Sequence, residues 1–143
     1  MEEGEGPAAD RTVRLHAAID SAGLQVQGEP VLVTSHSNDA WLINDSRLGE
    51  CVLRICWRGD RLRLLRESAV GRRLPAEVGY PTVLAAGSVH DRLLSWSLTR
   101  RLPGRSLLDA WPAMDDDERR RAASDLSDMI KALHGWPARR SGR

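Results

Sequence analysis

The chain has 143 residues, 41% of them hydrophobic and 29% charged, and a formal net charge of +1. These values exclude a fibrous or wholly disordered chain, and the length is enough for one domain with its own core. The near-zero charge gives no electrostatic basis for binding nucleic acid, because acidic residues accompany the arginine clusters. The sequence has neither a signal-peptide pattern nor the ~18 apolar residues of a membrane span, so we expect a cytoplasmic protein without membrane contact.

Two cysteines, Cys51 and Cys56, lie in one predicted strand. Because side chains alternate along a strand, these two positions are on opposite faces. Neither a disulfide nor a paired metal site uses such an arrangement. We therefore expect two reduced thiols in the core.

The N-terminal part is predicted to contain a tail and a short helix. Residues 1–9 are rich in Gly, Glu, Pro and Ala, and we expect them to be disordered. From Asp10 onward apolar residues recur at helical spacings, and Gly23 provides a stop. The apolar positions of this helix are Leu15, Ala18, Ile19 and Ala22.

Five short strands and one inserted helix are predicted next. The strands cover residues 24–34, 40–43, 51–56, 81–86 and 93–99. Pro30 cannot donate to a ladder, so a bulge is expected at 28–30. A helix over 61–74, with Asp60 as its N-cap, separates the third strand from the fourth. Residues 87–91 are expected to form the turn between the last two strands.

The C-terminal part is predicted to be helical. A short helix or turn over 106–111 precedes a longer helix that begins with a capping box of Asp115 and Glu118. The apolar stripe of the longer helix consists of Ala122, Leu126, Met129, Ile130 and Leu133. Residues 138–143 form a basic tail. Trp96 and Trp111 are interpreted as core residues.

Six segments of the sequence, in this order, carry a family resemblance. They are SHSNDAWLIND, CVLRI, RESAVGRRL, YPTVLAAGSV, LLSWSLTRRLPGRSL and LSDMIKALHG. Together they resemble the amino-terminal half of the aminoglycoside phosphotransferase-like (phosphotransferase enzyme) family, over about Leu24 to Gly135. The resemblance implies an α+β fold. A protein-kinase-like N-lobe, a five-stranded antiparallel sheet with an inserted helix, would cover 10–102, and the hinge and first helices of a truncated C-lobe would cover 103–137.

The resemblance also implies a nucleotide site on the N-lobe. The turn that covers the nucleotide would be Ser35, His36, Ser37 and Asn38. Arg54 takes the place of the strand lysine of protein kinases, and Val52, on the same face of the strand, would cover the base. Glu67 would be the helix carboxylate that holds Arg54 in place.

The implied hinge lies between the two lobes. It runs from Thr99 to Leu102, where main-chain groups of Arg101 and Leu102 would bond to the edge of an adenine or a guanine. ATP or GTP is therefore the implied cofactor.

Each of these residues also has a simpler interpretation. The turn fits an ordinary hairpin, and Arg54 could reach solvent from the end of its strand. Glu67 could pair at helical spacing with Arg63 or Arg66, an exposed contact worth only ~0.3–0.5 kcal/mol. A small α+β binding domain unrelated to the family therefore stays open.

The residues that perform phosphate transfer in the family are absent from the sequence. Its catalytic loop contains His-x-Asp followed by Asn. No histidine of the chain has an aspartate two positions later; the histidines are His16, His36, His90 and His134. Magnesium would bind only if a missing lobe were supplied, and the acidic run at 115–117 is interpreted as a helix cap.

Two functions follow from these observations. The first is the nucleotide-binding lobe of a truncated small-molecule kinase, inactive alone. The second is a non-catalytic module that binds nucleotide or a protein partner. In either case the apolar stripe of the helix over 115–134 would form a homodimer or bind a complementing C-lobe, because exposed apolar surface favours association.

Overall fold

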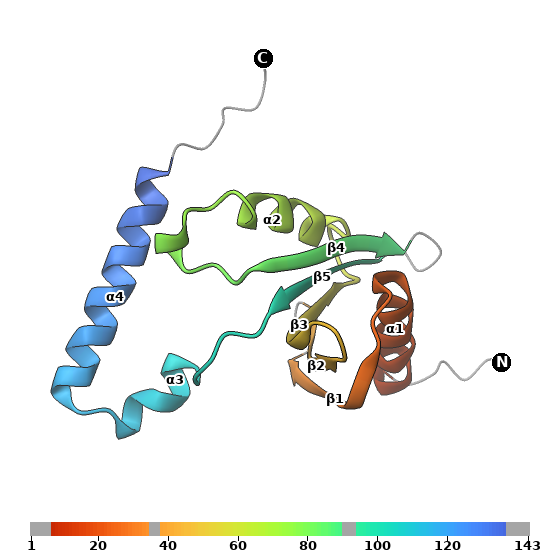
Figure 1. The fold of residues 1–143 in the computed structure, drawn as a ribbon, viewed down its shortest axis with the longest axis horizontal. Helices are drawn as coiled ribbons and strands as arrows, with labels where there is room; N and C mark the ends of the chain where they lie inside the picture. Colours follow the sequence, from red (N-terminus) through yellow and green to blue (C-terminus); the bar gives the residue numbers. More distant parts are fainter. Residues whose placement is uncertain (1–6, 35–37, 90–93, 137–143) are drawn as a thin grey trace, which may run out of the picture. The chain divides into compact units, whose positions relative to one another are not determined.

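The computed structural model describes residues 7–34, 38–89 and 94–136 (Figure 1). The chain divides into two compact units: residues 1–72 with 81–101, and residues 73–80 with 102–143. None of the helices within the described ranges is long and apolar enough to cross a lipid bilayer.

The first unit contains all five predicted strands and has the predicted helix between the third and the fourth. Its elements are α1 (Pro7–Ala22), β1 (Val26–Thr34), β2 (Asp39–Asp45), β3 (Gly49–Cys56), α2 (Arg63–Gly71), β4 (Val83–Val89) and β5 (Leu94–Arg100). The second unit is helical in its described part. Its elements are the 3-10 helices η1 (Ala76–Val78) and η3 (Trp111–Ala113) and the helices α3 (Leu107–Ala110) and α4 (Asp116–Gly135).

The five strands form one antiparallel sheet in the order β1-β2-β3-β5-β4. β3 is therefore flanked by β2 and β5, and its side chains alternate between the two faces of the sheet. Leu53 and Ile55 join the core beneath α1, whereas Arg54 between them reaches α2. The two helices thus cover opposite faces, as Figure 1 shows for α1 beside β1 and α2 along β4. This alternation separates the core from the candidate site.

The sheet face beneath α1 carries large apolar side chains. Leu15 and Ala18 of α1 are buried against it. The buried strand residues of this core are Ile43, Cys51, Leu53, Ile55, Leu94, Trp96 and Leu98. Trp96 is 4% exposed, which confirms its predicted place in the core, and its indole N–H donates to the Ser21 hydroxyl at 2.9 Å. Burial of this apolar surface is the main stabilising contribution in the unit.

The sheet face beneath α2 is lined by small and polar side chains. Ser95, Ser97 and Thr99 of β5 are buried, and α2 buries Leu64 and Ser68. In the described part of the chain, the hydroxyl oxygens of Ser95 and Ser97 have no hydrogen-bond partner. An unpaired buried polar group costs about 1–3 kcal/mol. α2 is therefore held on the sheet with less apolar contact than α1.

The N-terminal boundaries differ slightly from the prediction. α1 begins at Pro7, inside the segment predicted to be a tail, and residues 1–6 lie outside the described ranges. Proline suits a first helical position, because the amide hydrogen it lacks would have no partner there. The predicted bulge in β1 is confirmed: its register with β2 shifts between Gln27 and Val31, and Gly28 has a φ of 73°, which glycine adopts without strain.

α2 is shorter than predicted, and the predicted N-cap at Asp60 is wrong. Leu62 holds the N-cap position, and no side chain caps the helix there. Asp60 instead accepts a hydrogen bond from the Leu62 N–H at 3.2 Å and pairs with Arg66. These contacts turn the chain before the helix begins, so the first turn of α2 lacks the stabilisation that a cap provides.

β4 both begins and ends later in the sequence than the predicted strand over 81–86. It continues to Val89, through part of the predicted turn over 87–91. Gly87 lies opposite Trp96 of β5, and a Cβ atom at Gly87 would come within 2.6 Å of the indole Cζ2. The ring occupies the space that a side chain would need. The glycine at this position therefore permits close packing within a strand.

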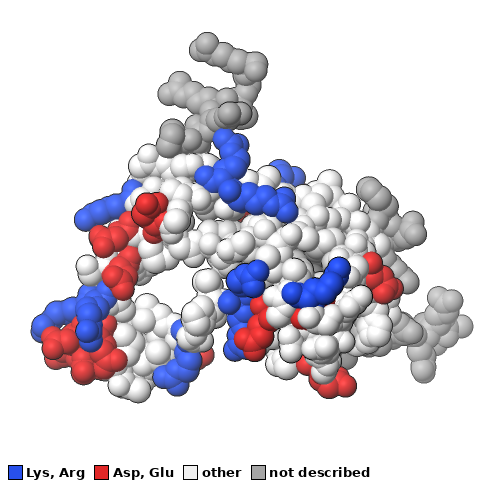
Figure 2. Space-filling model, in the orientation of Figure 1, with Lys and Arg blue, Asp and Glu red and all other residues white. Residues whose placement is uncertain are grey.

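The second unit confirms the predicted capping box of α4. Asp115 Oδ1 accepts from the Glu118 N–H at 2.8 Å, and Glu118 Oε1 accepts from the Asp115 N–H at 3.2 Å. The bond from the Glu118 N–H lowers the pKa of Asp115. Figure 2 shows acidic side chains gathered at the start of α4 with arginines beside them. Negative charge here also interacts favourably with the helix dipole.

The apolar side chains of the second unit are exposed. α4 has no buried residue. The exposed fractions are 47% for Leu126, 37% for Met129, 43% for Ile130 and 44% for Leu133. The prediction that Trp111 is a core residue is wrong, because it is 40% exposed. Arg119 lies over its ring at 5.2 Å and donates two hydrogen bonds to its carbonyl oxygen.

Candidate functional site

Arg54 of β3 and Glu67 of α2 form an ion pair. Arg54 Nη1 lies 2.6 Å from Glu67 Oε1, and Nη2 lies 3.4 Å from Oε2. The side chains are 28% and 34% exposed, so both are accessible from solvent. The two residues meet as expected, and a solvent-directed Arg54 is excluded. Their role in binding a nucleotide stays a prediction.

Val52 and Thr99 lie on the same sheet face as Arg54. In the strand register Val52 is opposite Thr99, and Arg54 is opposite Ser97. Positions two apart share a face. Val52 is half-buried and Thr99 is buried. The structure therefore brings together four of the predicted site residues, with Glu67 approaching from α2.

Asn38 is the one residue of the predicted nucleotide-covering turn that is described. Ser35, His36 and Ser37 lie outside the described residues. Asn38 is 7% exposed, and its Oδ1 accepts a hydrogen bond from Arg63 Nη2 at 2.8 Å. Arg63 is thus engaged with Asn38 one helical turn before Glu67.

The predicted hinge residues lie at the boundary between the two units. The Arg101 N–H donates to the Glu50 carbonyl oxygen at 3.2 Å, and Arg101 Nη1 is 3.4 Å from Glu50 Oε1. Leu102 is the first residue of the 102–143 segment of the second unit and is 54% exposed. A cleft of about 160 Å³ in the first unit is lined partly by Val31, Leu42 and Arg101. Base recognition by this segment stays a prediction.

A buried charge cluster beside Asn38 was not predicted from the sequence. Asp39 is fully buried and accepts hydrogen bonds from Arg14 at 2.7 and 3.1 Å and from the Trp57 indole N–H at 3.3 Å. The guanidinium groups of Arg14 and Arg58 each lie 3.9 Å from the centre of the Trp57 ring. One signal was available: Arg14 is four residues before Ala18, so it lies beside the apolar stripe of its helix.

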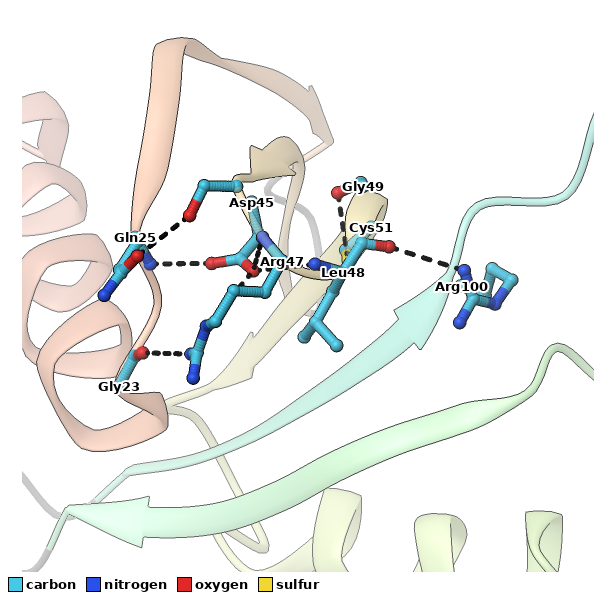
Figure 3. Close-up of polar contacts among 9 residues, drawn as sticks. Gly23, Gln25, Asp45, Arg47, Leu48, Gly49, Cys51 and Arg100 are labelled. Carbon is cyan, nitrogen blue, oxygen red and sulfur yellow. Dashed lines mark hydrogen bonds and ion pairs between the residues drawn. The ribbon is translucent and has the colours of Figure 1, made fainter.

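A second buried carboxylate, Asp45, joins the β2–β3 turn to the segment that follows α1 (Figure 3). Its oxygens accept from the N–H groups of Gln25 at 2.6 Å and of Arg47 and Leu48 at 2.9 Å. Burial acts to raise the pKa of Asp45, but these donors and the charge of Arg47 outweigh it, and the pKa lies below its usual value of 3.8. The ionised carboxylate therefore stabilises this turn.

The cysteines and the potential metal ligands are other residues that could carry chemistry. Cys51 and Cys56 are both buried and free, as predicted. Burial and the charge of Asp45 raise the pKa of the Cys51 thiol, which keeps it protonated. In the described ranges, no group of three or more His, Cys, Asp or Glu side chains could hold a metal ion.

Similarity to known proteins shows the family of the chain. The model of the phosphotransferase enzyme family matches residues 31–143. No curated protein sequence matches the chain significantly. The fold is similar to that of the GDP complex of wild-type aminoglycoside 2'-phosphotransferase-IIIa, with a TM-score of 0.69 and 22% identity over 87% of this chain and 42% of that chain. It is also similar to the GDP and kanamycin complex of APH(2")-IIia, with a TM-score of 0.59 and 20% identity over 90% of this chain and 42% of that chain.

These matches differ in what they establish. The structural similarities, at 22% and 20% identity, establish the fold, and the chain spans less than half the length of either solved chain. The family match covers most of the 143 residues. The chain therefore belongs to the phosphotransferase enzyme family, and its five-stranded sheet with one inserted helix is the kinase-like N-lobe fold of that family.

Proposed function

We propose that the chain is the nucleotide-binding lobe of a small-molecule phosphotransferase, and that it binds ATP or GTP on the sheet face that carries Arg54. The observation that carries this proposal is the Arg54–Glu67 ion pair, with its shorter contact at 2.6 Å. Both similar solved structures contain GDP, which supports a nucleotide as the ligand.

The ion pair suits Arg54 to contact phosphate. A guanidinium group has five N–H donors in a rigid plane, and two of its nitrogens are engaged with Glu67. The remaining donors are directed by that contact and can bond phosphate oxygens. A partly exposed ion pair contributes little to stability, so its main effect is to orient the guanidinium. Val52, on the same face, would pack against the base.

We expect binding to this chain alone to be weak and phosphate transfer to be absent. The cleft of about 160 Å³ near Arg101 is smaller than the ~300–1,000 Å³ typical of ligand pockets. The sequence also has no His-x-Asp motif to accept the proton of a substrate hydroxyl. Transfer to an aminoglycoside or another hydroxylated amine would require residues from elsewhere, together with the magnesium they would hold.

Thermal unfolding with and without nucleotide tests the proposal. GDP, GTP or ATP should raise the unfolding temperature of the wild-type chain, by an amount that grows with ligand concentration; at 100 times Kd the stabilisation is ~2.7 kcal/mol. Arg54→Gln and Glu67→Gln should lose most of this shift, and Arg61→Gln, a control at an exposed arginine before α2, should keep it. If no nucleotide stabilises the wild-type chain, the proposal is wrong.

A second candidate function is a non-catalytic module that associates through α4. The observation favouring it is the exposed apolar stripe of Leu126, Met129, Ile130 and Leu133 on a helix without buried residues. Apolar surface of this kind is stabilised when another surface covers it. The partner that supplies this surface would be a second copy of this chain or a complementing C-lobe.

Light scattering tests whether the chain forms a homodimer. Self-association predicts a dimer for the wild-type chain and a monomer for Ile130→Asp, with equal helix content by circular dichroism. Glu118→Gln, at the start of the same helix, does not alter the stripe and should stay dimeric. A wild-type chain that is monomeric at all concentrations would exclude the homodimer.

A further inference from the structure

α2 has two polar attachments to the sheet region, one helical turn apart. Arg63, its first residue, donates to Asn38 Oδ1 at 2.8 Å, and Glu67 accepts from Arg54. Residues four apart lie on the same side of a helix, so both contacts act on one side of α2. In the ladder, Arg54 is opposite Ala40, two positions after Asn38. The two attachment points are therefore offset by about two strand residues, which is similar to the rise of one helical turn.

The Asn38 end of this arrangement is firmly held. Asp39, the next residue, is fully buried and bonded to Arg14 of α1 and to the Trp57 indole. A buried carboxylate with this many partners leaves the chain little freedom at that point. Asn38 is thus a fixed point for Arg63, although the Arg63 side chain itself is exposed.

α2 buries little apolar surface against the sheet. Leu64 is its one fully buried apolar side chain, and every residue of α2 is described. The strand residues beneath it include Ser95 and Ser97, whose hydroxyls are unpaired among the described residues. No side chain caps its first turn. A short helix with so little apolar burial depends on its polar attachments for its position.

We propose that Arg63 is a positioning residue: by binding Asn38 it places α2 so that Glu67 meets Arg54. For nucleotide binding this inference rests on the proposed function, because Arg54 would be the phosphate ligand. We assign Arg63 no phosphate contact of its own. Its effect passes through Glu67, and its contact with Asn38 uses a single nitrogen, so lysine can replace it.

Two measurements on the full chain test this inference. The first is the NMR signal of the Arg54 guanidinium N–H groups without nucleotide. Arg63→Gln should move this signal toward that of Glu67→Gln, the reference for a broken pair, and Arg63→Lys should restore it. Asn38→Ala should act like Arg63→Gln, and the double variant should add nothing further. A wild-type Arg54 signal in folded Arg63→Gln would overturn the inference.

The second measurement compares the affinities for GDP and guanosine. Arg63→Gln should weaken GDP binding about tenfold, equivalent to roughly 1.4 kcal/mol, and leave guanosine binding unchanged, because guanosine has no phosphate. Arg61→Gln is the matched control and should alter neither affinity. Equal weakening of both ligands would overturn the role of Arg63 in placing Arg54 for phosphate. If the wild-type chain binds none of GDP, GTP and ATP, the proposed function fails, and the NMR measurement still decides whether Arg63 positions the ion pair.

Discussion

Arg14 of α1 and Asp39 at the start of β2 form a bidentate ion pair, although they lie 25 residues apart in the sequence. The distance from Nε to Oδ2 is 2.7 Å, and the distance from Nη2 to Oδ1 is 3.1 Å. The Asp39 side chain is 0% exposed and that of Arg14 is 13% exposed. The family match begins at residue 31, after α1. A helix that lies before the matched region is therefore joined to the sheet through a buried charge.

Arg14→Ala should strongly destabilise the chain. It leaves the Asp39 carboxylate buried without its cation, and breaking a buried pair in this way costs about 3–5 kcal/mol. Urea unfolding at pH 7 measures the loss. His16→Ala, at an exposed position on the same helix, should change the free energy of unfolding by less than about 0.5 kcal/mol. A loss below about 1 kcal/mol for Arg14→Ala would show that water replaces the guanidinium.

Asp45→Asn should destabilise the chain at neutral pH more than at acid pH. The folded-state pKa of Asp45 lies below its usual value, so the ionised form is favoured by folding. This contribution is fully present above the unfolded pKa, for which we take the usual value of 3.8, and is lost as the pH falls through the lower folded value. We expect a loss of about 2 kcal/mol at pH 7 that shrinks below pH 4, measured by urea unfolding. A pH-independent loss for Asp45→Asn would contradict the prediction.

Ser95→Ala and Ser97→Ala should leave stability unchanged or raise it. Each removes a buried hydroxyl that has no partner in the described part of the chain, so up to about 1 kcal/mol of desolvation cost is relieved. Thermal and urea unfolding measure the change. Ser46→Ala is the control for a hydroxyl that has a partner. It should not raise stability, because the exposed Ser46 hydroxyl donates to Gln25 Oε1 at 2.9 Å. Destabilisation by more than about 1 kcal/mol at Ser95 or Ser97 would reveal an ordered water beneath α2.

Gly87→Ala should destabilise the sheet by about 1–3 kcal/mol through overpacking. The new Cβ would lie 2.6 Å from Trp96 Cζ2, and the indole is held by its bond to Ser21. Differential scanning calorimetry measures the change. At Gly135 of α4 a Cβ meets nothing within 4 Å, so Gly135→Ala is the control and should be neutral. A neutral Gly87→Ala would mean that the indole can move aside.

Much of the sheet could be predicted because strands leave local patterns, whereas the Arg54–Glu67 contact was predicted from the family resemblance. Alternation marked β3, and Pro30 marked the bulge in β1. The position of Glu67 on the helix after β3 was carried by the family resemblance. The predicted ends of the elements were less accurate. Asp60, for example, has a side chain suited to cap a helix, but it contacts Leu62 and Arg66 in the turn before α2 instead.

Contacts set by tertiary docking could not be predicted. The partners Arg14 and Asp39 are 25 residues apart, and their meeting depends on where α1 settles on the sheet. The prediction for Trp111 was wrong for a related reason. An apolar residue is buried only if another element covers it, and the sequence alone does not show whether one does. The arginine beside the stripe of α1 was the one local sign of a buried partner.

The side chains of β3 alternate between the core face and the face of the candidate site, and this alternation determines what a substitution at each position affects. Leu53 and Ile55 act only on whether the chain stays folded, whereas Val52 and Arg54, interleaved with them, belong to the face of the candidate site. Under the proposed function, substitutions at Val52 and Arg54 should therefore change ligand preference with little loss of folding stability. An insertion of one residue in this strand would exchange the two sets and remove both properties at once.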